Sequence, residues 1–186
     1  GIFGSRDYDD ILHEESKLGS GFLANLAKDW EMASREAEKA GIRVVNLRFG
    51  TIISLSGGVL KKMYTPYRLC LGGPFGTGRQ MMSWISITDV LGLILFSISN
   101  NKVEGAVNAV APHAVTNEQF SELLAQTLDR PSSLRIPELF VESLFGEMGR
   151  ELLLSGQHAK PVKALKNGYE FLHSQLHDVF TYCLGV

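Results

Sequence analysis

The sequence has few cysteines, no excess of either charge and no long apolar run. Its 186 residues include two cysteines, Cys70 and Cys183, far apart and in apolar surroundings, so we expect reduced packing residues rather than disulfide or metal ligands. A net charge of -2 lacks the basic excess of nucleic-acid-binding proteins. The longest apolar run, residues 90–98, is shorter than the roughly 18 residues of a membrane span, and no signal peptide is visible. These absences predict a cytoplasmic protein with neither a nucleic acid nor a membrane as partner.

The histidines do not supply a metal-site pattern. His173 and His177 stand at helical spacing, but no third ligand lies near them in the sequence. We interpret this pair as part of a solvated helix face and predict no metal site.

Alternating helix and strand patterns predict an α/β fold. Apolar residues recur at helical spacing from Phe22 to Ala37, Gly41 ends that helix, and a β-rich run follows it. This order is the αβ half of a βαβ unit. Thr116 and Gln119 have the spacing of a capping box. The patterns further predict a loop at 7–21 and strands at 42–50, 84–87 and 106–110. They predict helices at 59–71, 116–128, 139–154, 162–167 and 174–184, and another helix that begins near residue 89.

A glycine-rich block at residues 72–89 carries the most specific candidate side chains. Arg79, Gln80 and Trp84 follow its glycines closely. Glycine lets backbone approach a ligand, and arginine is well shaped for a bidentate grip on phosphate or carboxylate. The structural alternative is a long surface loop closed by a buried tryptophan.

Other candidates stand where the predicted strands end. Gly50 and Thr51 follow the first strand, and ligands of open α/β sheets bind beyond the carboxyl ends of strands, although a plain strand exit gives the same pattern. Asn108 could hydrogen-bond a ligand or satisfy a neighbouring loop. Asp89 could act as an acid, but a helix N-cap is the stronger expectation.

The order of motifs resembles the nucleotide-sugar epimerase-like branch of the extended and atypical short-chain dehydrogenase/reductase superfamily. The resemblance covers nearly the whole chain, and residues 79–85 and the glycine–glutamine tail are its most specific parts. The motifs that carry it are Trp30-Glu31, residues 41–50, Gly57-Gly58, residues 72–89, residues 108–112, residues 116–120, and the tail with Gly156-Gln157, Pro161 and Gly168-Tyr169-x-Phe171.

The resemblance implies a fold and an activity. It implies the C-terminal half of a Rossmann-type, doubly wound domain at residues 1–115 and a small, mainly helical substrate-side domain at 116–186. It also implies an NADP(H)-dependent oxidoreductase or epimerase-like protein that acts on an anionic small molecule. The residues assigned to the nicotinamide end of the cofactor are Gly50, Thr51 and Ile52, and those assigned to a nucleotide-sugar-like substrate are Arg79, Gln80 and Trp84.

Two departures from the family pattern narrow this interpretation. Family members begin with a βαβ unit whose glycine-rich loop holds pyrophosphate, and this sequence has no such unit. We therefore expect the N-terminal half or a homo-oligomer as partner, and weak NADPH binding by the 186 residues alone. Leu23 and Ala27 stand where classical members carry a Tyr-x-x-x-Lys pair, and neither can move a proton. No catalytic residue is assigned, and a non-catalytic NADP(H)-binding regulatory module or an inactive gene fragment are the alternatives.

Overall fold

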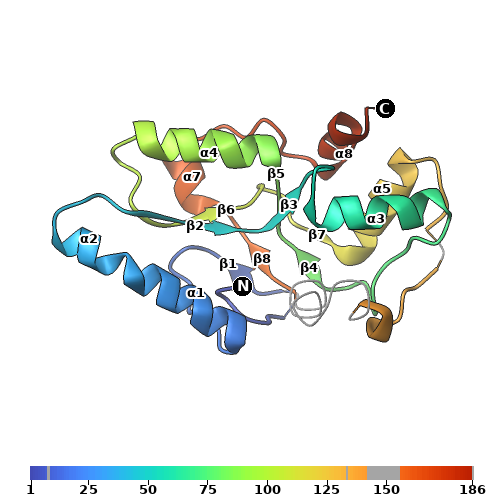
Figure 1. Cartoon of the computed structure of the whole chain (residues 1–186), viewed down its shortest axis with the longest axis horizontal. Coiled ribbons are helices and arrows are strands. Elements are labelled where there is room, and N and C mark those ends of the chain that lie inside the picture. Colours follow the sequence, from blue (N-terminus) through green and yellow to red (C-terminus); the bar gives the residue numbers. More distant parts are fainter. Residues whose placement is uncertain (8, 133, 142–155, 186) are drawn as a thin grey trace.

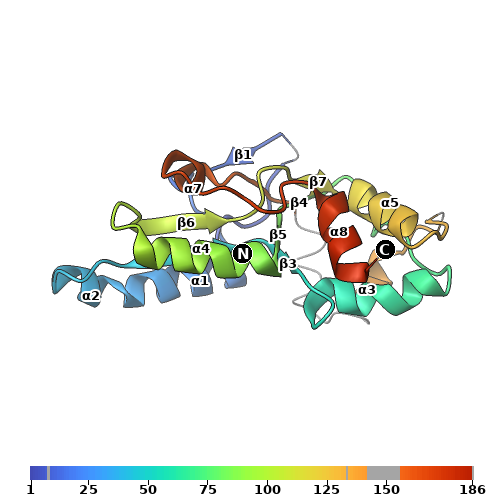
Figure 2. The ribbon, with the colours of Figure 1, turned by 90° about the horizontal axis from the view of Figure 1, so that it is seen from above.

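The computed structural model describes residues 1–7, 9–132, 134–141 and 156–185 and has an α/β fold, as the sequence predicts. The molecule is drawn out along one axis into two lobes (Figures 1 and 2). The described helices are α1 (Phe22–Ala33), α2 (Arg35–Lys39), α3 (Gly58–Arg68), α4 (Ile87–Ser99), α5 (Asn117–Thr127), α7 (Val162–Lys166) and α8 (Leu176–Leu184). The described strands are β1 (Ile11–Leu12), β2 (Val45–Phe49), β3 (Thr51–Ile53), β4 (Met81–Met82), β5 (Trp84–Ser86), β6 (Gly105–Ala109), β7 (Val115–Thr116) and β8 (His158–Ala159).

Two parallel strand pairs form the centre of the molecule. β2 pairs with β6 over its full length, with Arg48 opposite Asn108, and β3 pairs with β5, with Thr51 opposite Trp84. Helix α4 lies on one face of the β2–β6 pair, and α1 and α2 lie on the other (Figures 1 and 2). Covering both faces of a parallel pair with helices is the arrangement of α/β proteins, because parallel strands are stable when buried.

Two apolar cores lie on the two sides of the β3–β5 pair. Ile52 and Ile85 contribute to the core between β2, β6, α4 and α7. Their neighbours Ile53 and Trp84 point the other way, into the core that α3, α5 and α8 enclose. This alternation follows the two-residue period of a strand. Each core combines segments from both sides of residue 116, so the boundary predicted there stays a prediction about domain organisation.

Several predicted elements are confirmed and others are corrected. The capping box of Thr116 and Gln119 is present at the start of α5, and the predicted helices near 162–167 and 174–184 are α7 and α8. The first predicted helix is divided at Ser34 into α1 and α2. The predicted loop at 7–21 contains β1, which pairs with β8. Most of the helix predicted at 139–154 lies outside the described residues. No described helix is long and apolar enough to span a membrane.

Asp89 anchors the last segment of the chain to α4. It is not the N-cap of α4, because Ser86 takes that position and its hydroxyl accepts from the Asp89 N–H at 2.9 Å. The Asp89 carboxylate is 1 % exposed and accepts from the Ser86 hydroxyl at 2.7 Å. It also accepts from the backbone N–H groups of Leu172 and His173 at 2.8 and 3.0 Å, and from the Tyr169 hydroxyl at 3.2 Å. A buried carboxylate that serves several donors is a structural anchor.

We predict that Asp89→Asn lowers the free energy of unfolding by about 2–3 kcal/mol, because the new amide group turns a donor toward buried backbone N–H groups and leaves them unsatisfied. Urea unfolding of the variant measures the change. Asp178→Asn, on the exposed face of α8, is the matched control and should stay within about 0.5 kcal/mol of the parent. Equal losses in the two variants would contradict the anchoring role.

Tyr67 is a second buried polar contact, in the other core. Its hydroxyl hydrogen-bonds with that of Ser121, and its ring lies against the backbone of Gly72, where an added Cβ would sit 2.3 Å from the ring. Burial raises the pKa of the Tyr67 phenol from 10.0 to about 12, which outweighs the lowering by the Ser121 hydrogen bond. The folded state therefore holds the phenol proton more tightly than the unfolded state does.

The raised pKa of Tyr67 predicts an alkaline loss of stability. Because the folded-state pKa is the higher one, the contribution is complete below about pH 10 and is lost as the pH rises toward 12, with a total of roughly 2–3 kcal/mol. In Tyr67→Phe, the free energy of unfolding should depend less on pH in this window, as measured by urea unfolding across it. Tyr64→Phe, on the same helix, is the control and should keep the parental slope. Identical slopes for Tyr67→Phe and the parent would refute the assignment.

Candidate functional site

A groove of about 500 Å³ runs along the outer edge of β2. All five residues of β2 line it, together with Ala27 and Trp30 of α1 and the first three residues of the chain. Its volume is within the range of small-molecule sites. The polar side chains that line it are Glu31, Asn46, Arg48, Ser83, Asn108 and Gln157.

Arg48 is held in an ion pair at the floor of the groove. Its guanidinium donates to both carboxylate oxygens of Glu31, at 2.7 and 2.8 Å, and the two side chains are 11 % and 23 % exposed. Its remaining terminal nitrogen donates to the Glu14 backbone carbonyl at 2.9 Å, and the Phe3 ring lies 5.4 Å from the guanidinium carbon. Such a bidentate, largely buried pair fixes both partners. Arg48 is therefore committed to the structure.

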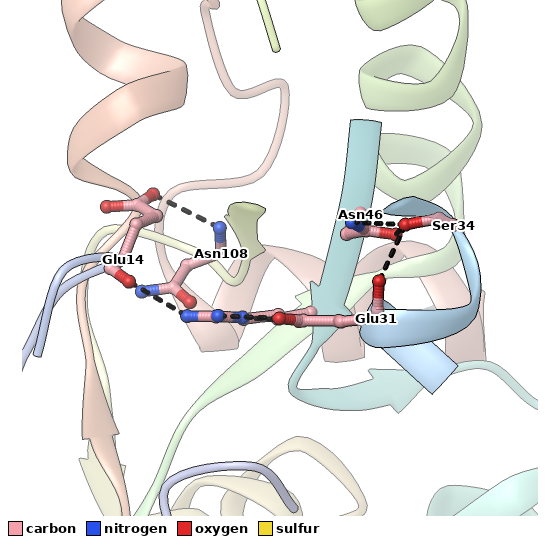
Figure 3. A network of polar contacts seen from close by, with 6 residues as sticks. Glu14, Glu31, Ser34, Asn46 and Asn108 are labelled. Atoms are coloured by element: carbon pink, nitrogen blue, oxygen red, sulfur yellow. Dashed lines mark hydrogen bonds and ion pairs between the residues drawn. The ribbon is translucent and has the colours of Figure 1, made fainter. Parts of the chain in front are cut away.

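Glu14 and Asn108 extend this network to β6 and α7. The Glu14 carboxylate is buried and accepts from the backbone N–H of Asn108 at 3.1 Å (Figure 3). It also accepts from the backbone N–H of Lys163 at 3.1 Å. The Lys163 N–H belongs to the first turn of α7, where a carboxylate is favourable. The Asn108 side-chain amide donates to the Lys160 carbonyl at 3.0 Å, so Asn108 does satisfy a neighbouring loop. Its Oδ1 is buried and has no hydrogen-bond partner among the described residues.

Gly50 lies at the end of the groove where β2 and β6 both finish. An added Cβ there would sit 2.6 Å from the Ser83 carbonyl oxygen and 2.9 Å from Val110 Cγ1, so the close packing requires glycine. Thr51 and Ile52 follow on β3, both half-buried, and neither lines the groove. Of the three residues assigned to the cofactor, Gly50 is therefore the one that reaches the groove.

The three residues assigned to the substrate occupy different environments. Arg79 is exposed, and its side chain makes no hydrogen bond or ion pair within the described part of the chain. The Gln80 amide donates to the Phe75 carbonyl at 3.1 Å and so holds the glycine-rich turn. Trp84 is fully buried, and its indole N–H donates to the His113 carbonyl at 2.8 Å. We therefore correct the substrate-facing assignment of Trp84, because its ring is a core side chain.

Ser83 and Gln157 are site residues that the candidate set did not include. The Ser83 hydroxyl donates to the Gln157 carbonyl at 2.7 Å and accepts from the Ala159 N–H at 2.8 Å. The Gln157 side chain donates to the Gly4 carbonyl at 2.8 Å, and its backbone N–H donates to the Met81 carbonyl at 3.0 Å. Gln157 belongs to the glycine–glutamine tail that the sequence analysis identifies as a specific motif. The sequence alone does not show which groups its side chain and backbone contact.

Leu23 and Ala27 occupy the positions at which classical family members carry the proton-transferring Tyr-x-x-x-Lys pair. Both are half-buried, Ala27 lines the groove, and neither has an ionisable group. Ser86, Asp89 and His173 are mutually close, but each is less than 9 % exposed, which keeps them from a substrate. No group of three or more His, Cys, Asp or Glu side chains in the described ranges is arranged to hold a metal ion.

Comparisons with known proteins agree with this fold. Residues 136–182 match a family model described as a domain of unknown function, DUF1731. An epimerase family protein of Mycobacterium bovis is 37% identical over 182 residues, which are 98% of this chain and 60% of that protein. An epimerase family protein of Bacillus subtilis is 35% identical, with 95% of this chain and 57% of that protein covered. The chain thus spans about 60% of the length of the curated relatives that it matches.

Solved structures are similar along almost the whole chain. The human epimerase family protein SDR39U1, solved with NADPH, has a TM-score of 0.90 and 30% identity over 98% of this chain and 62% of its own. A nucleoside-diphosphate sugar epimerase from Corynebacterium glutamicum has a TM-score of 0.82 and 30% identity over 100% of this chain and 36% of its own. Together with the parallel strand pairs and their covering helices, these similarities show that the chain is an epimerase-like member of the short-chain dehydrogenase/reductase superfamily.

Proposed function

We propose that the chain belongs to an NADP(H)-dependent oxidoreductase or nucleotide-sugar epimerase-like protein that acts on an anionic small molecule. The observation that carries the proposal is the position of Gly50, at the carboxyl ends of β2 and β6 and at the end of the groove. Ligands of parallel α/β sheets bind at such ends. The similarity to the human relative solved with NADPH supports NADP(H) as the cofactor.

The residues present suit the nicotinamide end of such a cofactor. Gly50 joins β2 to β3, and Thr51 and Ile52 begin β3, where backbone groups and an apolar side chain can border a flat ring. The groove of about 500 Å³ holds only part of a dinucleotide. This sequence has no glycine-rich pyrophosphate loop, so the residues present provide one wall of the cofactor site. When bound, the cofactor would supply hydride transfer, and these residues would orient its ring.

Arg79 and Gln80 are the proposed contacts for the anionic substrate. The Arg79 guanidinium is exposed and holds no ion pair within the described residues, which leaves its donors free for a phosphate or carboxylate. Gln80 holds the turn from which Arg79 projects, through its bond to the Phe75 carbonyl. Gln80 therefore positions that turn in addition to its proposed contact with the substrate.

A second candidate is an NADP(H)-binding module without turnover. Leu23 and Ala27, at the positions of the Tyr-x-x-x-Lys pair, favour it, because neither is an acid or a base. NADPH oxidation by a longer form of the protein, assayed with a panel of nucleotide sugars and carbonyl compounds, separates the two candidates. Turnover supports the enzyme, and binding without turnover supports the module.

We predict that NADPH shifts the backbone amide resonances of Gly50, Thr51 and Ile52 in a two-dimensional NMR titration of the 186-residue chain. Binding should be weak, because the main grip on a dinucleotide comes from a βα turn that this sequence does not contain. NADH, which lacks the 2′-phosphate, is the comparison ligand and should give smaller shifts. Gly168, in the turn after α7, is the internal reference and should not move. Shifts confined to other segments would exclude this cofactor wall.

We predict that Arg79→Ala weakens binding of a nucleotide sugar such as UDP-glucose by about 1.5–3 kcal/mol, the usual contribution of a charge-assisted hydrogen bond. Calorimetric titration of the parent protein and of Arg79→Ala with the nucleotide sugar measures the difference in binding free energy. The control is Arg35→Ala, which removes an exposed arginine from α2 and should leave the affinity unchanged. Unchanged affinity in Arg79→Ala would remove Arg79 from the substrate site.

A further inference from the structure

Helix α4 turns an apolar side toward the solvent. Leu91, Leu95 and Ile98 stand three and four residues apart, on one side of the helix, and are 58%, 66% and 66% exposed. Asp89 is the one ionisable residue of α4, and it is buried. The solvent side of a helix in a globular protein ordinarily carries charged and polar residues. The composition of α4 is therefore that of a helix covered on both sides.

The other sides of α4 are already packed. Val90 and Leu93 belong to the core over β2 and β6. On one flank, the Tyr169 ring meets that of Phe96 edge to face, with centroids 5.3 Å apart, and an added Cβ on Gly92 would sit 2.5 Å from the Tyr169 hydroxyl. Figure 1 shows α4 along the upper border of the molecule. The side with Leu91 and Leu95 is thus the side that remains for a partner.

The exposed residues of α4 are arranged almost symmetrically about Leu93. Leu91 and Leu95 lie two residues to either side of it, and Ile87 and Ile98 lie six residues before and five after. These four exposed residues are called the α4 face below. If two α4 helices cross antiparallel on a two-fold axis near Leu93, Leu91 meets Leu95 of the second copy, and Ile87 meets Ile98. The face is therefore complementary to itself, as a two-fold interface requires.

The charge of the α4 face also favours a second copy as its partner. A two-fold contact brings each side chain of the face close to the same set of side chains, so any net charge there would repel its own copy. The exposed residues of the face are all leucine or isoleucine, which removes that repulsion. A partner that binds through charge would find nothing to pair with on this face.

The area of the surface is sufficient for a weak dimer. Leu172 adds to it at the amino end of α4, because it is 70% exposed and its N–H donates to the Asp89 carboxylate at 2.8 Å. With Leu172, the α4 face exposes on the order of 500 Å², or about 1,000 Å² over two copies, which is close to the minimum for a specific interface. An apolar patch of this size usually marks an interaction surface. An interface near the minimum area predicts micromolar rather than nanomolar affinity.

We propose that the α4 face binds a second copy of this chain, with the two α4 helices antiparallel about a two-fold axis and Leu91 packed against Leu95 of the second copy. This inference concerns assembly, goes beyond the proposed function and does not rest on it. Helices α4 and α1 lie on opposite faces of the β2–β6 pair, so the interface does not involve the residues exposed on α1 (Figure 2).

Sedimentation velocity of the 186-residue chain between about 1 and 200 μM tests the dimer, because a micromolar dissociation constant places the transition in this range. Leu95→Arg should raise the dissociation constant at least about tenfold, because it places two like charges near the two-fold axis. Phe22→Arg is the matched control: Phe22 is 74% exposed on α1, and the variant should keep the parental constant. Circular dichroism establishes that both variants are folded. A monomeric parent at the highest concentration would overturn the proposal, and so would a dimer that Phe22→Arg weakens and Leu95→Arg does not.

Cysteine cross-linking tests the direction of the two helices. In a background with Cys70→Ser and Cys183→Ser, proteins with Leu91→Cys and with Leu95→Cys are oxidised separately and as a mixture. The mixture should give at least about threefold more cross-linked dimer than either protein alone, because antiparallel helices place position 91 beside position 95 of the second copy and hold identical positions too far apart for a disulfide. Equal cross-linking in all three samples, or none in any of them, would overturn the antiparallel pairing.

Discussion

The ion pair of Arg48 and Glu31 is the contact on which the lobe around the groove depends. It joins α1 to β2, and Arg48 also donates to the Glu14 carbonyl. The Glu14 carboxylate in turn accepts from backbone N–H groups of β6 and of the first turn of α7. These elements are separated along the sequence. Removing one partner of such a pair leaves a buried charge without compensation, which costs far more than the pair itself contributes. The network therefore specifies how α1 lies on the sheet.

The same network holds the charged side chains beside the groove. Arg48 and Glu31 line it and Glu14 lies next to it, and each is hydrogen-bonded within the protein. Asn108 also lines the groove, and its side-chain oxygen is buried without a hydrogen-bond partner among the described residues. The close-packed turn at Gly50 closes the end of the groove with backbone.

Local patterns predicted much of the fold. The capping box at Thr116 and Gln119 was predictable because it depends on two side chains within one turn, and the strand before Gly50 because its apolar run is short and bounded by glycines. The pairing of β1 with β8 was not, since two-residue strands from opposite ends of the chain have no periodicity of their own. The buried position of Trp84 is not predictable in the same way, because proximity to Arg79 in the sequence says nothing about which face of β5 the ring occupies. Glu14 and Ser83 were missed because their roles arise only when distant segments meet.

The alternation of residues along β3 and β5 has a mechanical consequence. Since adjacent side chains of one strand pair belong to different cores, the two cores share the β3–β5 pair as a common wall. A hinge needs a few residues that can change their backbone angles freely, and here the crossing point is hydrogen-bonded and buried on both sides. A hinge motion at this crossing point would have to break the β3–β5 hydrogen bonds and expose both cores.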